Sequence, residues 1–528
     1  MKNIDTAELL NQIWQEVLNT KEINDSQNFF LSGGDSLLAV RFLTKCKDNR
    51  IPISIKDLYM LQSLGELKEH LIQKQVNDEN LISTVLNIKE KDHKLLPTQY
   101  RWVNEPVRDI NYFNLGALYY TPIELTVEKL RDAIKIVIDR NEALRTAYKK
   151  VSTGWIAQVM PPDIDKVLIK SNYEDYNNLL NEMSEECHLA QKTMDIEEGV
   201  VFRILYFPFN GERGRLLILA HHLTIDGFSI NLLVDEIEQA LQSVMGISEA
   251  NKNVSIQPFR YIEEIEKWVV SQEANEDAKK WLAQPWDSIM KFPKEKDGNG
   301  EGLLTTIHTL RGVVPLKETQ YLKDIARRYN IGLSEVLLAA AVYVISQWNE
   351  QKIHGIDIYH HGRDITPFDL DISETVGYVL NTYPVILNCT HINENSNWIE
   401  QMAEQFNYLP KRRFGFDALC YFSNPAHKEL QKLPKLNIRY NFRGQMNRLM
   451  QRHDSLLELA PNNELYGPNR SQEQSERYLL MLEGDVVEDC LVFGIKFSED
   501  HYKLETIQIL IDKTISMLIK KAREKELV

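Results

Sequence analysis

A polar segment divides this chain into two parts of very different size. Residues 73–94 read QKQVNDENLISTVLNIKEKDHK, which is highly charged apart from one short apolar patch. Such a composition favours a linker over a packed element. The chain has 528 residues, which is too many for one hydrophobic core. The sequence therefore predicts a small N-terminal domain, a linker and a much larger body.

The N-terminal part has the pattern of a helical domain. Apolar residues in 5–19 recur at the spacing of one helix face, and 37–46 and 64–73 show the same periodicity. An all-helical unit of this size is small but large enough to fold alone. We assign residues 1–75 to this domain and 76–94 to the linker.

The body alternates strand-like runs with amphipathic helical patterns. We expect strands at 117–120, 215–220, 353–359, 376–387 and 436–441. We expect helices at 128–140, 232–243, 318–329, 334–347 and 504–521. This mixture predicts an α/β or α+β body of two lobes, which we divide into 95–265 and 266–528.

Composition and charge exclude several classes of function. The formal net charge of −15 argues against nucleic acid as a partner, because phosphate binding needs a basic surface. The cysteines stand far apart, without CxxC spacing, so we expect neither a metal site nor a disulfide framework. The first residues are amphipathic rather than apolar, and the longest apolar run, 336–345, is about half of a membrane span. We expect a cytoplasmic protein that does not enter a membrane.

One short motif in the N-terminal domain points to chemistry. Residues 29–37 read FFLSGGDSL, so two glycines and an acid precede Ser36 at the start of a helical pattern. Glycines allow a tight turn that leaves the Ser36 hydroxyl open to a modifying enzyme. A serine after aspartate is also common as a plain helix N-cap, and GGDS alone favours that interpretation.

The context of the motif changes this balance. An amphipathic helix, a long loop, FFLSGGDSL and a second helix together resemble the peptidyl carrier domains of nonribosomal peptide synthetases over residues 1–75. The resemblance implies that Ser36 carries 4′-phosphopantetheine, whose thiol holds an acyl or aminoacyl group as a thioester. It also implies a phosphopantetheinyl transferase as a partner.

A second motif ends a strand-like run in the body. Residues 216–227 read LLILAHHLTIDG, so two histidines follow an apolar segment and precede an acid and a glycine. A histidine on an apolar strand is usually a hydrogen-bonded core residue, but HHxxxDG at a strand end is more specific. Alternation along a strand sends His221 and His222 to opposite sides, so only one should face a given cavity.

Residues 95–528 resemble the condensation domains of the same synthetases. The likeness rests on HHxxxDG and on three further blocks, at 96–102, 140–146 and 376–382. It implies two chloramphenicol-acetyltransferase-like lobes with a tunnel between them, where His222 meets two pantetheine arms. We assign His222 and His221 as candidate catalytic residues. The resemblance also implies a structural role at the site for Asp226, with Gly227 beside it, and Arg363 as the partner of Asp226. A buried aspartate without such a partner would be costly.

The expected reaction needs few catalytic groups from the protein. An amine attacks a thioester, which needs an unprotonated amine and help for the developing charge. A histidine that titrates near neutrality suits proton transfer or positioning of the amine. Much of the rate can come from holding two tethered reactants together.

Epimerisation is the main alternative, since epimerisation domains share the fold and several blocks of this sequence. Moving a proton between the two faces of a Cα atom needs two acid/base groups, and the family supplies a glutamate just before HGR. Tyr359 occupies that place here, and an ordinary tyrosine, with a pKa of about 10, substitutes poorly. The tryptophan usual after the histidine motif is replaced by Ile230, and 381–382 fits the condensation pattern. We predict amide formation, with an epimerase or a catalytically silent recruiting domain as alternatives.

Two further alternatives have less support from the sequence. A free CoA-dependent acyltransferase shares the fold and an HxxxD motif, but the upstream carrier makes a free CoA donor unnecessary. A pure binding module is the non-enzyme interpretation. The sequence contains no recognisable adenylation domain, so we expect loading by an adenylation protein in trans. The acceptor should be a downstream carrier or a free amine.

Overall fold

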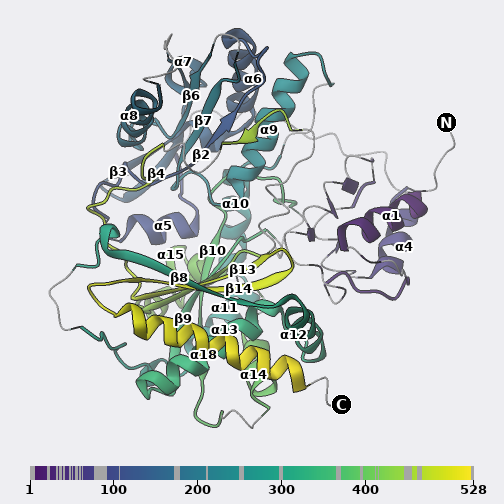
Figure 1. Cartoon of the computed structure of the whole chain (residues 1–528), viewed down its shortest axis with the longest axis vertical. Helices are drawn as coiled ribbons and strands as arrows, with labels where there is room; N and C mark the ends of the chain where they lie inside the picture. The colour runs from purple at the N-terminus through teal and green to yellow at the C-terminus, as the bar shows by residue number, and fades with distance from the viewer. Residues whose placement is uncertain are drawn as a thin grey trace.

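The computed structural model covers most of the chain, and Figure 1 shows its arrangement. Within 6–75 the described residues exclude 19, 21–23, 31, 33, 35–37, 40–41, 44, 47–48, 50, 54–56, 59–60 and 62. Within 92–524 they exclude 106, 172–178, 210–211, 249–254, 297–300, 364–369, 393–396, 411, 414, 445–454 and 461–465. The predicted linker lies almost wholly outside the described residues.

The N-terminal domain is helical where it is described. It contains α1 (Thr6–Leu18) and α4 (Leu64–Gln75), close to the expected helices at 5–19 and 64–73. Three buried aromatic rings form the centre of its core. The Trp14 ring meets Phe29 and Phe42 edge-on, with centroid distances of 5.2 and 5.7 Å. The expected helical domain is confirmed.

A sheet with the order β12-β2-β7-β6-β5 forms the N-terminal lobe of the body (Figure 1). Its strands are β2 (Asn114–Tyr120), β5 (Leu168–Lys170), β6 (Phe202–Phe207), β7 (Arg215–His221) and β12 (Glu458–Leu459). The even-numbered side chains of β7 pack with α6 (Val127–Arg140) and α9 (Ser229–Val244), and its odd-numbered ones with α8 (Leu179–Lys192). Burial on both faces explains the continuous apolar run of β7.

Smaller elements complete this lobe. A second sheet has the order β1-β4-β3, with β1 (Asp92–His93), β3 (Thr146–Val151) and β4 (Gly154–Val159). Short helical turns are α7 (Ile164–Val167) and η1 (Glu142–Arg145). The helix α5 (Pro97–Val103) lies between the two lobes in Figure 1.

The C-terminal lobe is built on a sheet with the order β10-β9-β11-β13-β14-β8. Its strands are β8 (Ile307–Val314), β9 (Ile353–His360), β10 (Asn381–Asn388), β11 (Ile438–Phe442), β13 (Leu480–Val487) and β14 (Cys490–Ser498). β11 runs parallel to both of its neighbours, β9 and β13, and the other pairs are antiparallel. The two-lobed body of mixed helices and strands is confirmed.

Helices cover one face of this sheet (Figure 1). They are α12 (Leu316–Arg328), α13 (Leu333–Asn349), α14 (Trp398–Tyr408) and α18 (Leu504–Arg523). The remaining helical elements are α10 (Pro258–Val269), α11 (Gln272–Leu282), α15 (Gly415–Tyr421), α16 (His427–Gln431), η2 (Trp286–Ser288) and η3 (Leu304–Thr306). The expected helices in the body correspond to α6, α9, α12, α13 and α18.

The described residues contain no single helix that is long and apolar enough to cross a bilayer. Among them, only α12 and α13 taken together reach that length and composition, and the chain bends by 100° between them. α13 is a core helix, since its residues from Val336 to Ser346 are buried.

The two lobes are not separate in sequence. β12, which lies in the range predicted for the C-terminal lobe, pairs with β2 of the N-terminal lobe, Glu458 opposite Tyr120. The predicted boundary at 265/266 falls inside the continuous helix α10. The exact domain limits therefore stay a prediction.

One expected strand is shorter than predicted. We expected a strand over 376–387, whereas β10 begins only at Asn381. The backbone before it bonds to the turn after the histidines. Gly377 O accepts from Asp226 N at 3.2 Å, and Leu380 N donates to Asp226 Oδ2 at 2.9 Å. These bonds replace the strand pairing that the apolar pattern suggested.

Candidate active site

The histidine motif begins where the buried strand β7 ends. His221 lies opposite Asn114 of the neighbouring strand β2. The chain then turns, because Thr224 N donates to His221 O at 2.9 Å. His222 is the first residue of this turn, and its own N–H donates to Phe113 O at 2.7 Å.

His221 uses both of its ring nitrogens inside the protein. Leu223 N donates to His221 Nδ1 at 3.1 Å, so the proton is on Nε2, which donates to Ile110 O at 2.9 Å. The side chain is fully buried, and burial lowers the pKa of His221 to about 3. His221 is therefore neutral and has no ring nitrogen available for a substrate.

His222 keeps one nitrogen open. Its Nδ1 donates to Ile225 O at 2.9 Å, and the lone pair of Nε2 has no partner among the residues that the structure describes. The residue is partly buried between the rings of Phe113 and Tyr378, at centroid distances of 4.7 and 5.4 Å. Burial lowers the pKa of His222, while the bond to Ile225 and the charge of Asp226 oppose that shift. The two histidines thus differ in what they offer, although β7 ends at His221 and His222 lies in the turn that follows, so strand alternation does not describe this pair.

Asp226 and Arg363 form the ion pair that the sequence predicted. Arg363 Nη1 lies 2.9 Å from Asp226 Oδ2, Arg363 Nη2 lies 3.1 Å from Asp226 Oδ1, and both side chains are buried. Asp226 Oδ1 also accepts from Ser229 N at 2.8 Å. Arg363 Nη2 donates to Thr375 O at 3.1 Å. The pair fastens the turn after the histidines to the start of β10 and to the end of β9.

Two glycines near this pair differ in how strictly the backbone requires them. Gly227 is exposed, and a Cβ atom built on it would meet nothing within 4 Å. Gly362, which the sequence argument did not single out, has a φ of +75°. A Cβ at Gly362 would lie 2.2 Å from Val379 O. The glycine of HGR is therefore needed for the approach of the Arg363 segment to the backbone just before β10.

Tyr359 lies on β9, just before the HGR segment. Its ring lies beneath the Arg439 guanidinium at 5.0 Å and meets the Tyr478 ring edge-on at 6.2 Å. Tyr478 in turn donates from its hydroxyl to Asp357 Oδ2 at 2.8 Å. The place that epimerisation domains give to a glutamate is therefore occupied by a phenol packed between an arginine and a second phenol.

The helix α5 holds the histidine turn from the other side. Gln99 Nε2 donates to Leu223 O at 2.7 Å and to Tyr148 Oη at 3.0 Å. The Trp102 ring stacks on Phe113 at 5.6 Å, next to His222. Gln99 and Trp102 belong to the opening block at 96–102, but their contacts could not be inferred from the sequence.

A tunnel at His222 stays a prediction. One pocket of about 430 Å³ lies on the other side of α5, and a much smaller one lies beside Tyr378. His222 lines neither of these two pockets, which are formed by described residues.

The loop that leads to Ser36 is only partly described, and Ser36 itself lies outside the described residues. Gly34 N donates to Phe29 O at 2.9 Å. A Cβ atom on Gly34 would lie 2.4 Å from the Phe29 ring, so only glycine fits against this core residue. Two residues before Ser36, the chain therefore packs directly on the core of the domain.

Two family models match the chain. The Condensation domain model covers residues 89–526, and the Phosphopantetheine attachment site model covers residues 8–71. The chain belongs to the condensation-domain family. Its helical N-terminal part is a carrier domain with a phosphopantetheine attachment site, so the family and the cofactor expected from the two motifs are confirmed.

Relatives of known identity agree with this assignment. A linear gramicidin synthase protein of Brevibacillus parabrevis is 26% identical over 523 residues, which is 97% of this chain but 6% of that relative. Gramicidin S synthase 1 of Brevibacillus brevis is 24% identical over 535 residues, which is 96% of this chain and 46% of that relative. The chain therefore spans less than half the length of either relative.

Solved structures share the fold of the condensation domain. The epimerization domain from the third module of tyrocidine synthetase B matches with a TM-score of 0.71 at 19% identity, over 83% of this chain and 98% of that one. The first condensation domain of the calcium-dependent antibiotic synthetase matches with a TM-score of 0.57 at 16% identity, over 82% of this chain and 97% of that one. At these identities the two structural matches establish the fold alone.

Proposed function

We propose that this chain joins an acyl or aminoacyl group carried on Ser36 to an amine, forming an amide bond. The phosphopantetheine arm on Ser36 supplies the thiol that holds the donor as a thioester. The observation that carries the proposal is the state of His222, whose Nδ1–H is bound to Ile225 O and whose Nε2 is open. A single base in this state is enough for amide formation.

His222 acts on the amine in this proposal. As the amine nitrogen bonds to the thioester carbonyl carbon, Nε2 accepts the proton that the nitrogen loses. The C–S bond then breaks, and the pantetheine thiolate leaves and takes up that proton, so the products are the amide and the free pantetheine thiol. Because burial lowers the pKa of His222, the imidazole is neutral and ready to accept at pH 7. The bond to Ile225 O fixes the ring while it holds that proton. Bringing the two reactants together contributes much of the remaining rate.

The neighbouring residues have positioning roles. His221, with both nitrogens bonded, keeps the end of β7 in place and is not proposed to touch substrate. Asp226 and Arg363 hold the turn that carries His222 against β10. Gly227 keeps a structural role in this proposal.

Epimerisation remains the second candidate. The sequence blocks shared with epimerisation domains favour it. Against it stands the need for a second acid/base group, because Tyr359 packs on Arg439 where a carboxylate would be needed. A catalytically silent recruiting domain is the third candidate.

Partners follow from the same proposal. A phosphopantetheinyl transferase modifies Ser36, an adenylation protein acting in trans loads the thiol, and an amine on a downstream carrier or a free amine accepts the acyl group. A cytoplasmic location stays a prediction from the sequence.

The carrier step is tested first by intact mass spectrometry. Incubation with a phosphopantetheinyl transferase and CoA should add one phosphopantetheine mass, and Ser36→Ala should abolish the addition. Ser32→Ala is the matched control, because Ser32 lies in the same loop and should leave labelling unchanged. Labelling that persists in Ser36→Ala would refute the assignment of Ser36.

The activity is tested by loading an L-aminoacyl group onto Ser36 in deuterated water, with and without candidate amines. We expect amide product that depends on His222 and no deuterium at Cα. Exchange at Cα that is lost in both His222→Ala and Tyr359→Phe would replace the proposal with epimerisation. Neither product nor exchange across carriers and amines would support the recruiting domain instead.

A further inference from the structure

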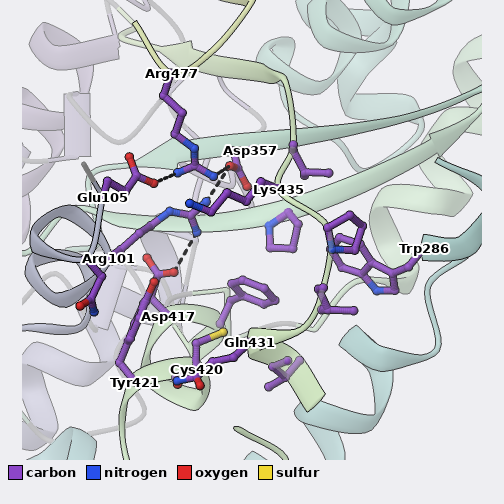
Figure 2. Close-up of a pocket in the computed structure, with 17 residues that line it drawn as sticks. Arg101, Glu105, Trp286, Asp357, Asp417, Cys420, Tyr421, Gln431, Lys435 and Arg477 are labelled. Atoms are coloured by element: carbon purple, nitrogen blue, oxygen red, sulfur yellow. Dashed lines mark hydrogen bonds and ion pairs between the residues drawn. The ribbon is translucent and has the colours of Figure 1, made fainter. Parts of the chain in front are cut away.

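A pocket of about 430 Å³ lies beside α5, away from the histidine turn (Figure 2). Its walls come from α5, α15, η2 and the segment that precedes β11. This volume is within the range of small-molecule binding sites in proteins. None of the residues assigned to the amide-forming reaction lines it.

One end of the pocket is charged. Arg101 bridges two carboxylates, with Nη2 at 2.6 Å from Asp357 Oδ2 and Nη1 at 3.0 Å from Asp417 Oδ1 (Figure 2). Arg477 pairs with Glu105 and lies 3.6 Å from Asp357. The lining contains three positively charged residues, Arg101, Lys435 and Arg477, and three negatively charged ones, Glu105, Asp357 and Asp417. These charges balance, so the pocket favours a ligand that is neutral overall or carries both signs.

Asp417 has an oxygen that lacks a donor within the described part of the protein. The Thr98 hydroxyl has one hydrogen, which it donates to Leu380 O at 2.6 Å. That hydroxyl lies 3.5 Å from Asp417 Oδ2 and cannot donate to it as well. The Asp417 side chain is only 1% exposed, and a buried carboxylate oxygen without a donor is unfavourable. An N–H group from a ligand in the pocket would supply the missing bond.

Lys435 offers a cation at the same end. Its side chain extends toward the charged end of the pocket in Figure 2. Its ammonium group forms no ion pair with a carboxylate of the described residues. Lys435 can therefore bind an anionic group of a ligand without breaking an existing pair.

The other end of the pocket is apolar. Trp286 lines it together with Phe416, Leu433 and Leu436. The only donor of the indole, Nε1, is already bound to Trp281 O at 2.7 Å. Trp286 therefore presents only carbon to the pocket, and this end suits an apolar side chain.

We propose that this pocket binds a free α-amino acid with an apolar side chain. The ammonium group donates to Asp417 Oδ2, the carboxylate pairs with Lys435, and the side chain lies against Trp286. This binding site is additional to the amide-forming function and does not depend on it.

The ligand is tested by isothermal titration calorimetry on the full-length Ser36→Ala chain at pH 7.5, with L-phenylalanine as the probe. 2-Phenylethylamine lacks the carboxylate, and 3-phenylpropionate lacks the ammonium group. We expect L-phenylalanine to bind and each analogue to bind at least about 10-fold more weakly, since each loses one charge-assisted hydrogen bond. No heat with millimolar L-phenylalanine, or equal affinity for 3-phenylpropionate, would overturn the proposal.

Two variants locate the ligand without removing the buried carboxylates. Lys435→Ala should weaken L-phenylalanine about 10-fold and leave 2-phenylethylamine unchanged, because only the former has a carboxylate. Lys432→Ala is the matched control, since Lys432 belongs to the same segment, pairs with Glu429 and does not line the pocket. Leu433→Trp should abolish binding by filling the apolar end. Unchanged binding in Lys435→Ala or Leu433→Trp would refute the site.

The pH dependence gives an independent check on Asp417. Burial raises its pKa to about 6, and Arg101 and Arg477 oppose that shift while Asp357 adds to it. Protonation removes the negative charge of Asp417 and weakens its hydrogen bond with an ammonium group, so affinity for L-phenylalanine should fall as the pH is lowered through about 6. His222→Ala should bind L-phenylalanine like the parent. Loss of binding in His222→Ala would place the ligand at the histidine site and overturn the proposal.

Discussion

Two buried ion clusters lie on either side of residues 378–381, and their carboxylates differ in how completely they are hydrogen-bonded. One is the pair of Asp226 and Arg363, and the other joins Arg101 to Asp357 and Asp417. Asp226 has a donor on each oxygen, from Arg363, from two backbone N–H groups of α9 and its preceding turn, and from Leu380 N. Asp417 shares its arginine, Arg101, with Asp357 and keeps one oxygen without a donor among the described residues. The carboxylate of the first cluster is closed, meaning fully bonded within the protein, although Arg363 Nε has no hydrogen-bond partner among the described residues, whereas the second cluster borders a pocket.

Whether its oxygens are already bonded within the protein thus distinguishes a carboxylate that stabilises the fold from one that can bind a ligand. A carboxylate whose oxygens are all bonded has nothing left to offer a ligand, so its contribution is to the fold. The same distinction applies to the histidines, since His221 is closed and His222 is open. The number of unused lone pairs therefore predicts which residues affect binding or rate, and which affect stability.

Breaking the closed pair should have the largest effect on stability. Arg363→Ala leaves the Asp226 charge buried without its partner, and we expect the free energy of unfolding to fall by about 3 to 5 kcal/mol. Urea denaturation followed by tryptophan fluorescence measures this loss. The double variant Asp226→Leu/Arg363→Met should lose less than Arg363→Ala. A single variant as stable as the parent would show that the pair is not a buried cluster in solution.

The two histidines should respond oppositely to the same substitution. His222→Ala should lower the rate of amide formation about 10²-fold and the free energy of unfolding by only about 1 kcal/mol, since Ile225 O alone loses its donor. His221→Ala leaves Ile110 O and Leu223 N without their partners, so unfolding should become easier by about 2 kcal/mol. Single-turnover kinetics and denaturation on both variants test this. A stability loss larger in His222→Ala than in His221→Ala would contradict the distinction between open and closed groups.

The pH profile of the reaction sharpens the assignment of His222. Only neutral His222 can accept a proton, and burial lowers its pKa below the usual 6.5. After division by the fraction of acceptor amine that is unprotonated, the rate should therefore rise with pH around a midpoint below 6.5. The charge of Arg470 contributes to that lowering, so Arg470→Gln should move the midpoint upward. A midpoint above 6.5 in the parent would contradict the neutral imidazole.

Asp417→Asn should have the smallest effect, because Arg101 keeps its bond to Asp357. At pH 7 the substituted chain should be at least as stable as the parent, because the raised pKa of Asp417 means that its ionised carboxylate is disfavoured in the folded state. The pKa of Asp417 is raised from 3.8 to about 6, so the native state takes up a proton that the unfolded state does not bind between about pH 6 and 4. The parent therefore gains stability from Asp417 as the pH falls through this window. In urea denaturation, the stability of Asp417→Asn relative to the parent should fall from pH 7 to pH 4.5, and a relative stability that rises would indicate a closed carboxylate.

Much of the closed cluster was predictable from the sequence. A buried aspartate requires a cationic partner, and the family resemblance pointed to Arg363, although 137 residues separate it from Asp226. The strand before His221 and the helix after Gly227 followed from hydrophobic periodicity. The tautomer of His222 was not predictable, because it depends on the direction in which the turn points Ile225 O.

The pocket was beyond the reach of the sequence. Its lining brings together Arg101, Trp286, Asp357, Asp417 and Arg477, which belong to five distant segments. None of these segments carries a motif that marks it as part of a pocket. The missing donor at Asp417 depends on which acceptor the Thr98 hydroxyl chooses, and only the packing of α5 against residues 378–381 decides that.

The pairing of β12 with β2 has a consequence for biosynthesis. The chain leaves the ribosome from its N-terminus, so the open edge of β2 is exposed long before Glu458 and Leu459 have been translated. Ala460 N, which bonds to Leu118 O at 2.9 Å, arrives equally late. An uncovered strand edge is a template for pairing with other chains, and distant pairings form slowly. Until residues 458–460 have been translated, the open edge of β2 in the nascent first lobe is therefore a site at which aggregation can begin.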